Sequence, residues 1–238
     1  MTRLLRSLRL SPVLALLLCA GCVPTGQVER GLERELPKLL GPADRYDVEI
    51  DGLRARSGEA EHVTVVGERV RAEGAPVVDR LELDLRGVVY DRDEERLERV
   101  DSAHATARIT ALDLADFLET QRNVRDAEIT FRAPDEATIR VRPEFGGVAL
   151  PRGVAAVVTG RLEIVDGRVY FAVEEVKAAG FDLGAAVARR LSESINPLVD
   201  LTDMAAGLRV TDVRVEDGVV RLDAAGDITG LRLRKDDS

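Results

Sequence analysis

The chain of 238 residues contains no tryptophan, three tyrosines, five phenylalanines, two histidines and two cysteines. So few aromatic side chains argue against a surface that stacks sugars or nucleobases. His62 and His104 lie far apart in the sequence, and no cluster of other ligands accompanies either, so we expect no histidine-based metal site. The net charge of −9 also argues against nucleic-acid binding, because phosphate backbones favour basic patches.

Motifs that would indicate catalysis are missing as well. No phosphate-binding loop or G-x-G-x-x-G turn follows a predicted strand, and no G-x-S-x-G segment is present. Asp101, Ser102 and His104 are close in sequence, but strand alternation places Asp101 on the opposite face from the other two. The acids of segment 91–95 alternate like calcium ligands but lack the glycine and distant glutamate of a calcium loop. The sequence therefore predicts neither an enzyme nor a bound metal or cofactor.

The first 22 residues have the features of an exported segment. Three arginines are followed by the apolar stretch Leu10–Leu18, which is shorter than the ~20 residues that a membrane-spanning helix needs. Small residues then lead to Cys22, and the segment resembles a bacterial lipoprotein signal in which residues 1–21 are removed and Cys22 is acylated. Cys19 departs from that pattern, which usually has leucine at this position. An ordinary secretory signal cleaved nearby is the alternative.

An acylated Cys22 would determine how the rest of the chain meets the membrane. Residues 22–27 would form a short tether, and no thiol would remain for a disulfide or a metal. No second apolar stretch is long enough to cross a bilayer, whereas two acyl chains on Cys22 would give stable attachment. We therefore expect a membrane-anchored lipoprotein of the bacterial cell envelope, on the periplasmic face or the cell surface.

Beyond the tether, helical and extended patterns alternate. Apolar residues at helical spacing predict helices over Gln27–Leu40, Leu112–Gln121 and Leu183–Ser194. We expect Pro37 to kink or restart the first helix, and Thr110 to cap the second. Alternation of apolar and polar residues, with hairpin turns at Asp-Gly pairs, predicts strands that include Tyr46–Ile50, Leu81–Leu85, Ala103–Ile109, Val124–Arg132, Ala137–Arg142, Val154–Val165, Arg168–Lys177, Leu208–Glu216 and Val219–Ala225.

This order of elements indicates an α+β fold with a long, mostly antiparallel sheet. We expect one domain over residues 28–230 and a frayed, charged tail over residues 231–238. Ala103, Ala105 and Ala107 place small side chains on one face of a strand. Small residues there let a sheet curl closely around a helix or leave room inside, and a tightly packed core is the alternative.

Several segments resemble a known family. They are Ala107–Leu114 with Phe117-Leu118, Thr159–Leu162 with Asp166–Arg168, Ile195–Leu201 and Gly207–Val210. These packing and turn signatures resemble the LmeA-like phospholipid-binding proteins, closely over residues 100–227 and loosely over residues 28–99. The resemblance implies a strongly curved sheet wrapped around a long helix, as in tubular lipid-binding proteins. It also implies an apolar tunnel for a phospholipid or related glycolipid.

By analogy with that family, the tunnel wall would be formed by apolar residues in and near two predicted helices. They are Leu114, Phe117, Leu118, Phe181, Leu183, Val187 and Leu191. The alternative for each residue is ordinary core packing, because apolar helical stripes usually face the core. The function implied is lipid transport or envelope maintenance by a membrane-anchored lipid-binding protein. A non-enzymatic scaffold that binds another envelope protein is the alternative.

Overall fold

The computed structural model describes residues 25–91, 96–120, 124–145, 148–149, 155–200, 208–216 and 218–232. The predicted signal, Cys22 and the end of the charged tail lie outside these ranges, as does most of the acidic segment 91–95. No helix within them is long and apolar enough to cross a membrane.

The described residues form three helices and thirteen strands. The helices are α1 (Thr25–Leu40), α2 (Ala111–Thr120) and α3 (Ala185–Ile195). The strands are β1 (Arg45–Asp51), β2 (Glu59–Val70), β3 (Val78–Asp91), β4 (Arg96–Thr110), β5 (Val124–Arg132), β6 (Glu136–Phe145), β7 (Val148–Ala149), β8 (Ala156–Val165), β9 (Arg168–Ala178), β10 (Phe181–Asp182), β11 (Val199–Asp200), β12 (Arg209–Glu216) and β13 (Val219–Arg232).

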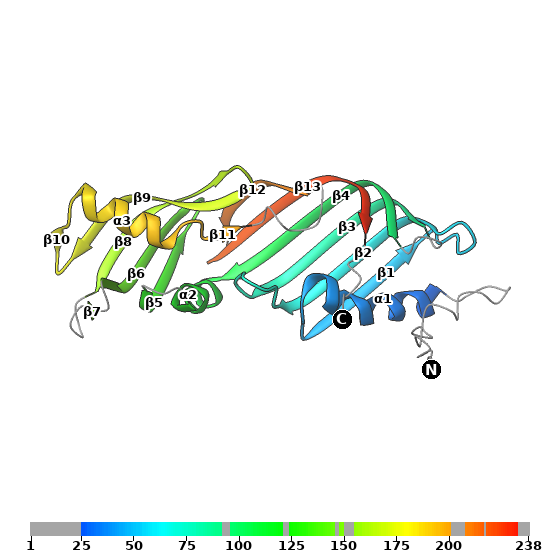
Figure 1. Ribbon diagram of the computed structural model, residues 1–238, viewed down its shortest axis with the longest axis horizontal. Coiled ribbons are helices and arrows are strands. Elements are labelled where there is room, and N and C mark those ends of the chain that lie inside the picture. The colour runs from blue at the N-terminus through cyan, green and yellow to red at the C-terminus, as the bar shows by residue number, and fades with distance from the viewer. Residues whose placement is uncertain are drawn as a thin grey trace, which may run out of the picture.

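The strands assemble into two antiparallel sheets (Figure 1). The first sheet has the order β1-β2-β3-β4-β13-β12, so β13 returns from the end of the chain to pair with β4. The second sheet has the order β10-β9-β8-β6-β5, with β11 paired to β9 and β7 paired to β6. The predicted α+β class and antiparallel pairing are confirmed. The division of the strands between two sheets is a feature that the sequence patterns did not reveal.

Most predicted elements form, with shifts at their ends. Helix α1 begins two residues before the predicted start and continues through Pro37, which lies in its last turn and removes only one backbone donor. Thr110 caps α2, because the Asp113 N–H donates to Thr110 Oγ1 at 3.1 Å. Helix α3 begins after Gly184, whose φ of 75° is accessible to glycine, so Leu183 precedes the helix instead of starting it.

The inner face of the first sheet is apolar across its strands. Residues in directly opposed register on that face are Val48, Val65, Leu83, Ala105, Ala224 and Val210 in one row, and Tyr46, Gly67, Leu81, Ala107, Leu222 and Val213 in the next. Helix α1 covers the end of the face formed by β1 and β2, where Leu36 packs into a cluster with Val48 and Val65. The alternation that predicted these strands thus separates an apolar inner face from a polar outer face.

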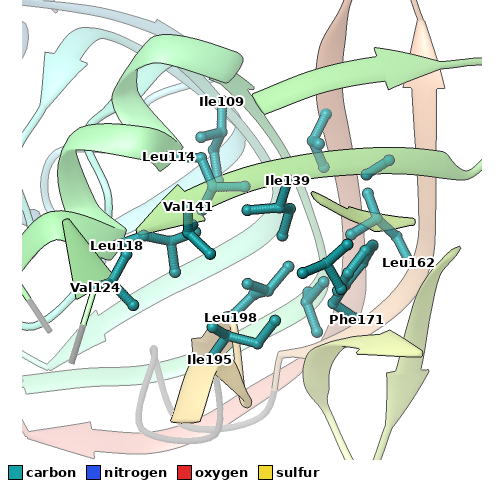
Figure 2. Close-up of a cluster of buried hydrophobic side chains, with 14 of the residues drawn as sticks. Ile109, Leu114, Leu118, Val124, Ile139, Val141, Leu162, Phe171, Ile195 and Leu198 are labelled. Atoms are coloured by element: carbon teal, nitrogen blue, oxygen red, sulfur yellow. The ribbon is translucent and has the colours of Figure 1, made fainter. Parts of the chain in front are cut away.

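The second sheet surrounds the larger buried cluster, shown in Figure 2. Phe171 of β9 and Ile139 of β6 contribute from the sheet, Leu118 from α2, and Ile195 from α3. The same cluster includes Val220 of β13, so it continues beneath one end of the first sheet. A backbone hydrogen bond of 2.6 Å from the Val215 N–H to the Pro134 carbonyl also joins the two sheets. The two sheets therefore share one apolar interior.

Candidate functional site

An unbroken apolar lining follows the inner faces of both sheets. The cluster under α1 and the larger cluster of Figure 2 are separate groups of fully buried residues. Val78 and Ala107, both half-buried, pack against the two clusters and connect them. Apolar contacts therefore continue from α1, across the first sheet, to the second sheet. Neither of the two side chains that make this connection is charged.

The middle of the first sheet includes a row of this lining that is only partly covered. Leu83, Ala105, Ala224 and Val210 lie directly opposite one another on four neighbouring strands and are all half-buried. We call these four residues the open strip. Val65 continues the same row and is buried, since α1 packs over that part of the sheet. The open strip thus begins where the cover provided by α1 ends.

Two of the four side chains of this strip are small. Ala105 and Ala224 occupy its centre, and each projects only a methyl group from the sheet. The alternating alanines of β4 were the sequence signal for this property. The four-residue strip itself was missed, because it requires the pairing of β4 with β13, far away in the sequence.

The outer face of the first sheet carries basic and acidic side chains that pair with one another. Arginines pair with acids two residues away on the same strand: Arg45 with Asp47, Arg80 with Glu82, Arg214 with Asp212, and Arg221 with Asp223. His62 Nε2 lies 2.7 Å from Asp84 Oδ2, and this hydrogen bond lowers the pKa of the Asp84 carboxyl. Charged and polar side chains dominate this solvated face among the described residues, so the apolar inner face is the better candidate for an apolar ligand.

A partly buried ion pair holds α2 against the first sheet. The Asp113 side chain is 4% exposed, and it accepts hydrogen bonds from Arg69 Nη1 at 2.7 Å and Thr110 Oγ1 at 2.6 Å. The hydrogen bond with Asp113 raises the pKa of Arg69. The sequence indicated the helix cap at Thr110, but not Arg69, which lies 44 residues before Asp113.

The residues predicted for the tunnel wall fall into two groups. Leu114 and Leu118 are buried in the larger cluster (Figure 2). Phe117 packs against the same cluster and is half-buried, so these three lie together. Phe181 and Leu183 are 75% and 36% exposed beyond the end of β9. Val187 and Leu191 belong to α3, but their side chains lie outside the described part of the structure.

The two best-formed hollows in the described part of the chain are both open to solvent. One, of about 550 Å³, lies between β9 and α3 and is lined by Val173, Val176, Ala188 and several charged residues. The other, of about 450 Å³, lies on the charged outer face of β1, β2 and β3. Both hollows have charged side chains in their lining, and neither is an enclosed apolar tunnel.

Groups with catalytic or metal-binding potential are dispersed. Within the described ranges no three histidine, cysteine or acidic side chains gather as a metal site would require. Asp101, which lies close to Ser102 and His104 in the sequence, forms an ion pair of 2.9 Å with Arg99. His62 is engaged with Asp84 on the outer face.

A family model described as LmeA-like phospholipid-binding matches residues 26–225. The chain belongs to this family. The match begins in α1 and ends in β13, so it includes residues of both sheets and all three described helices. It confirms the resemblance seen in the sequence and extends it firmly over the N-terminal strands, where the sequence resemblance was loose. No curated protein and no solved structure matches the chain.

Proposed function

We propose that this member of the LmeA-like family binds a phospholipid or related glycolipid with its acyl chains along the inner face of the first sheet. The observation that carries the proposal is the open strip, an apolar row that is half-buried and that continues through Leu83 and Val65 into the cluster under α1. Its role would be lipid transport or maintenance of the cell envelope.

Acyl chains suit such a surface for a simple physical reason. Each methylene group removed from water contributes about 0.8 kcal/mol, and this gain requires no directional polar partner. Ala105 and Ala224 present small apolar side chains at the centre of the strip, while Leu83 and Val210 supply apolar contact on either side. An unliganded strip of this kind would leave apolar side chains in water, so a lipid would replace solvent there.

The predicted wall residues fit this proposal at one end of the lining. Leu114, Phe117 and Leu118 belong to the cluster against which Ala107 packs, and Ala107 is the next inner-face residue after Ala105 on β4. An acyl chain that extends beyond the open strip toward α2 would therefore meet these three residues. Phe181 and Leu183 are exposed beyond the end of β9, so we place neither along the open strip. Val187 and Leu191 remain predictions from the sequence.

We also propose that the protein is exported and anchored to an envelope membrane through an acylated Cys22. The basic and apolar character of residues 1–18 and the small residues before Cys22 support this. Helix α1 begins at Thr25, three residues after Cys22, so the anchor would hold this end of the protein close to the bilayer.

Native mass spectrometry tests the lipid-binding proposal. The chain from Val23 onward, which contains every described helix and strand, is purified without detergent and compared with Ala105→Trp and with His104→Trp. His104 is the neighbouring residue on the exposed outer face, so its variant is a matched control for an added indole. We expect a stoichiometric phospholipid mass in the parent and in His104→Trp, and about a tenfold loss of occupancy in Ala105→Trp.

Two results would contradict the proposal. Equal occupancy in both folded tryptophan variants would remove the open strip as the site. A parent chain that stays free of lipid after incubation with envelope phospholipids would favour the scaffold alternative. Thermal unfolding of each variant, followed by circular dichroism, verifies that Ala105→Trp is folded, and Ala105→Leu is the smaller substitution if it is not.

A further inference from the structure

Basic side chains follow the solvent-facing side of helix α1. Arg30, Arg34 and Lys38 are spaced four residues apart, so they lie along one side of the helix, and all three are exposed. Lys38 forms an ion pair of 2.8 Å with Glu35, which is also exposed. Arg30 and Arg34 form no ion pair within the described part of the chain. We call Arg30, Arg34 and Lys38 the basic stripe.

The other two acidic residues of α1, Glu29 and Glu33, are both half-buried. Helix α1 lies beside β1, an edge strand of the first sheet (Figure 1). Glu29 Oε1 accepts a hydrogen bond of 3.1 Å from the Ile50 N–H of this strand, so its charge is used at the sheet edge. The exposed side of α1 therefore carries more basic than acidic side chains, although the whole chain has a net charge of −9.

Two leucines of α1 are exposed as well. Leu32 is 39% exposed and Leu39 is 47% exposed, and they lie on one side of the helix because about two turns separate them. Leu36, between them in the sequence, is buried in the cluster with Val48. The apolar surface of α1 thus exceeds what the first sheet covers. Apolar residues beside a basic stripe are typical of helices that lie at a membrane surface.

The proposed anchor lies directly before this helix. Helix α1 begins at Thr25, three residues after Cys22, and three residues span at most about 10 Å. An acylated Cys22 would therefore hold the start of α1 at the surface of a bilayer. Arginine and lysine side chains suit the lipid phosphates of that surface, and their apolar stems can lie beside leucines at the edge of the acyl region.

We propose that the exposed side of α1 docks onto the surface of an anionic phospholipid bilayer, with the basic stripe against lipid phosphates and with Leu32 and Leu39 at the boundary of the acyl chains. This inference rests on the proposed anchor at Cys22, which would bring the bilayer to α1. Two observations identify the bilayer as the occupant: the short connection from Cys22 to Thr25, and the complementarity between the basic stripe and anionic headgroups.

The chain from Cys22 onward contains one cysteine and no tryptophan, which makes a direct test possible. The Cys22 thiol is coupled to a maleimide lipid in vesicles, so attachment does not depend on acylation in the cell. Leu39→Trp places a fluorescent probe on α1. Val165→Trp is a matched control in the second sheet, because Val165 is 45% exposed and Leu39 is 47% exposed. The vesicles contain brominated phosphatidylcholine, with or without phosphatidylglycerol.

We expect the emission of Leu39→Trp to shift to the blue and to be quenched in vesicles that contain phosphatidylglycerol. The response should weaken at high salt and without phosphatidylglycerol, because the basic stripe attracts anionic headgroups. Val165→Trp should not respond. Absence of quenching in Leu39→Trp, or equal quenching in both variants, would overturn the proposal. Circular dichroism verifies that each variant is folded, and Leu32→Trp is the second probe of α1.

Charge reversal tests the basic stripe itself. Arg30→Glu combined with Arg34→Glu, in the Leu39→Trp chain, should lower the ratio of docked to undocked protein about tenfold. Arg189→Glu combined with Arg190→Glu is the matched control, since it changes the net charge equally at two exposed residues of helix α3. This control should leave the ratio unchanged. Equal losses in the two double variants would overturn docking through the basic stripe.

A separate measurement tests the anchor on which this inference rests. Mass spectrometry of the protein produced from its full chain in bacteria should show an acylated Cys22 as the first residue. An unmodified Cys22 would overturn the proposed anchor alone, because the maleimide lipid supplies the attachment in the docking experiment.

Discussion

The inner faces of the two sheets have the same alternating apolar pattern, but they differ in how completely their side chains are covered by other parts of the chain. In the second sheet, Phe171 is completely buried and Ile139 is 1% exposed, because α2 and α3 pack into the same cluster (Figure 2). In the first sheet, α1 covers only the end near β1 and β2, and Leu83 and Ala105 remain half-buried. At these positions the inner face of the first sheet is therefore less completely covered than that of the second sheet.

This difference indicates that substitutions in the two regions should affect different properties: folding stability in the second sheet and ligand binding in the first. A close-packed cluster loses stability when any large side chain is removed, because the cavity left behind is only partly refilled. A half-covered row of small residues tolerates change with less effect on folding, and changes there act on binding instead. The predictions below test this division, from the largest expected effect to the smallest.

The largest contrast should be between Phe171→Ala and Leu83→Ala. Phe171 is fully buried in the second sheet, so its truncation should lower the free energy of unfolding by about 3–5 kcal/mol. Leu83 is half-buried in the open strip, so its truncation should cost less than about 2 kcal/mol. Urea unfolding followed by circular dichroism measures both values. Similar losses for the two variants would contradict the difference in filling.

An intermediate effect is expected where the two regions meet. Arg69→Met removes the hydrogen bond of 2.7 Å to the buried Asp113 carboxylate, which keeps the one from Thr110, and should lower the free energy of unfolding by about 1–3 kcal/mol. Asp113→Asn in the Arg69→Met background should recover part of that loss, because the unpaired buried charge is removed. Arg45→Met, which removes an exposed pair with Asp47, is the control and should have no measurable effect.

Additivity of the two junction substitutions would show that Arg69 and Asp113 do not interact energetically. In that case the ion pair would not hold α2 against the first sheet, and the core cluster alone would join the regions.

The smallest effect concerns acid pH on the outer face. The hydrogen bond with His62 lowers the pKa of Asp84 in the folded protein. A lowered folded-state pKa stabilises the protein above the unfolded value of about 3.9 and loses this contribution as pH falls through the folded value. Asp84→Asn should therefore be slightly less stable than the parent at neutral pH, by less than about 1 kcal/mol for so exposed a pair.

The difference between Asp84→Asn and the parent should disappear as the pH falls below about 4. Thermal unfolding across this pH range measures it, and His62→Gln should behave in the same way because it removes the partner. A difference that persists unchanged at low pH would show that the carboxylate does not contribute through its charge.

The sequence by itself determined the local structure and the family. Periodicity of 3.6 or two residues identified α1, α2 and most of the long strands, because each element must turn one apolar face inward. Asp166-Gly167 forms the predicted turn between β8 and β9, and Thr110 caps α2, since these signals act within a few residues.

Only the tertiary structure decided how these elements combine. The pairing of β4 with β13 joins segments more than one hundred residues apart, and it depends on burying whole faces rather than on local preference. The same holds for the separation into two sheets and for the contact of Arg69 with Asp113. Alternation could mark Ala105 as inward-facing, but whether it is covered depends on where α1 ends over the sheet. The open strip is therefore a property of packing between distant elements, which no single stretch of sequence encodes.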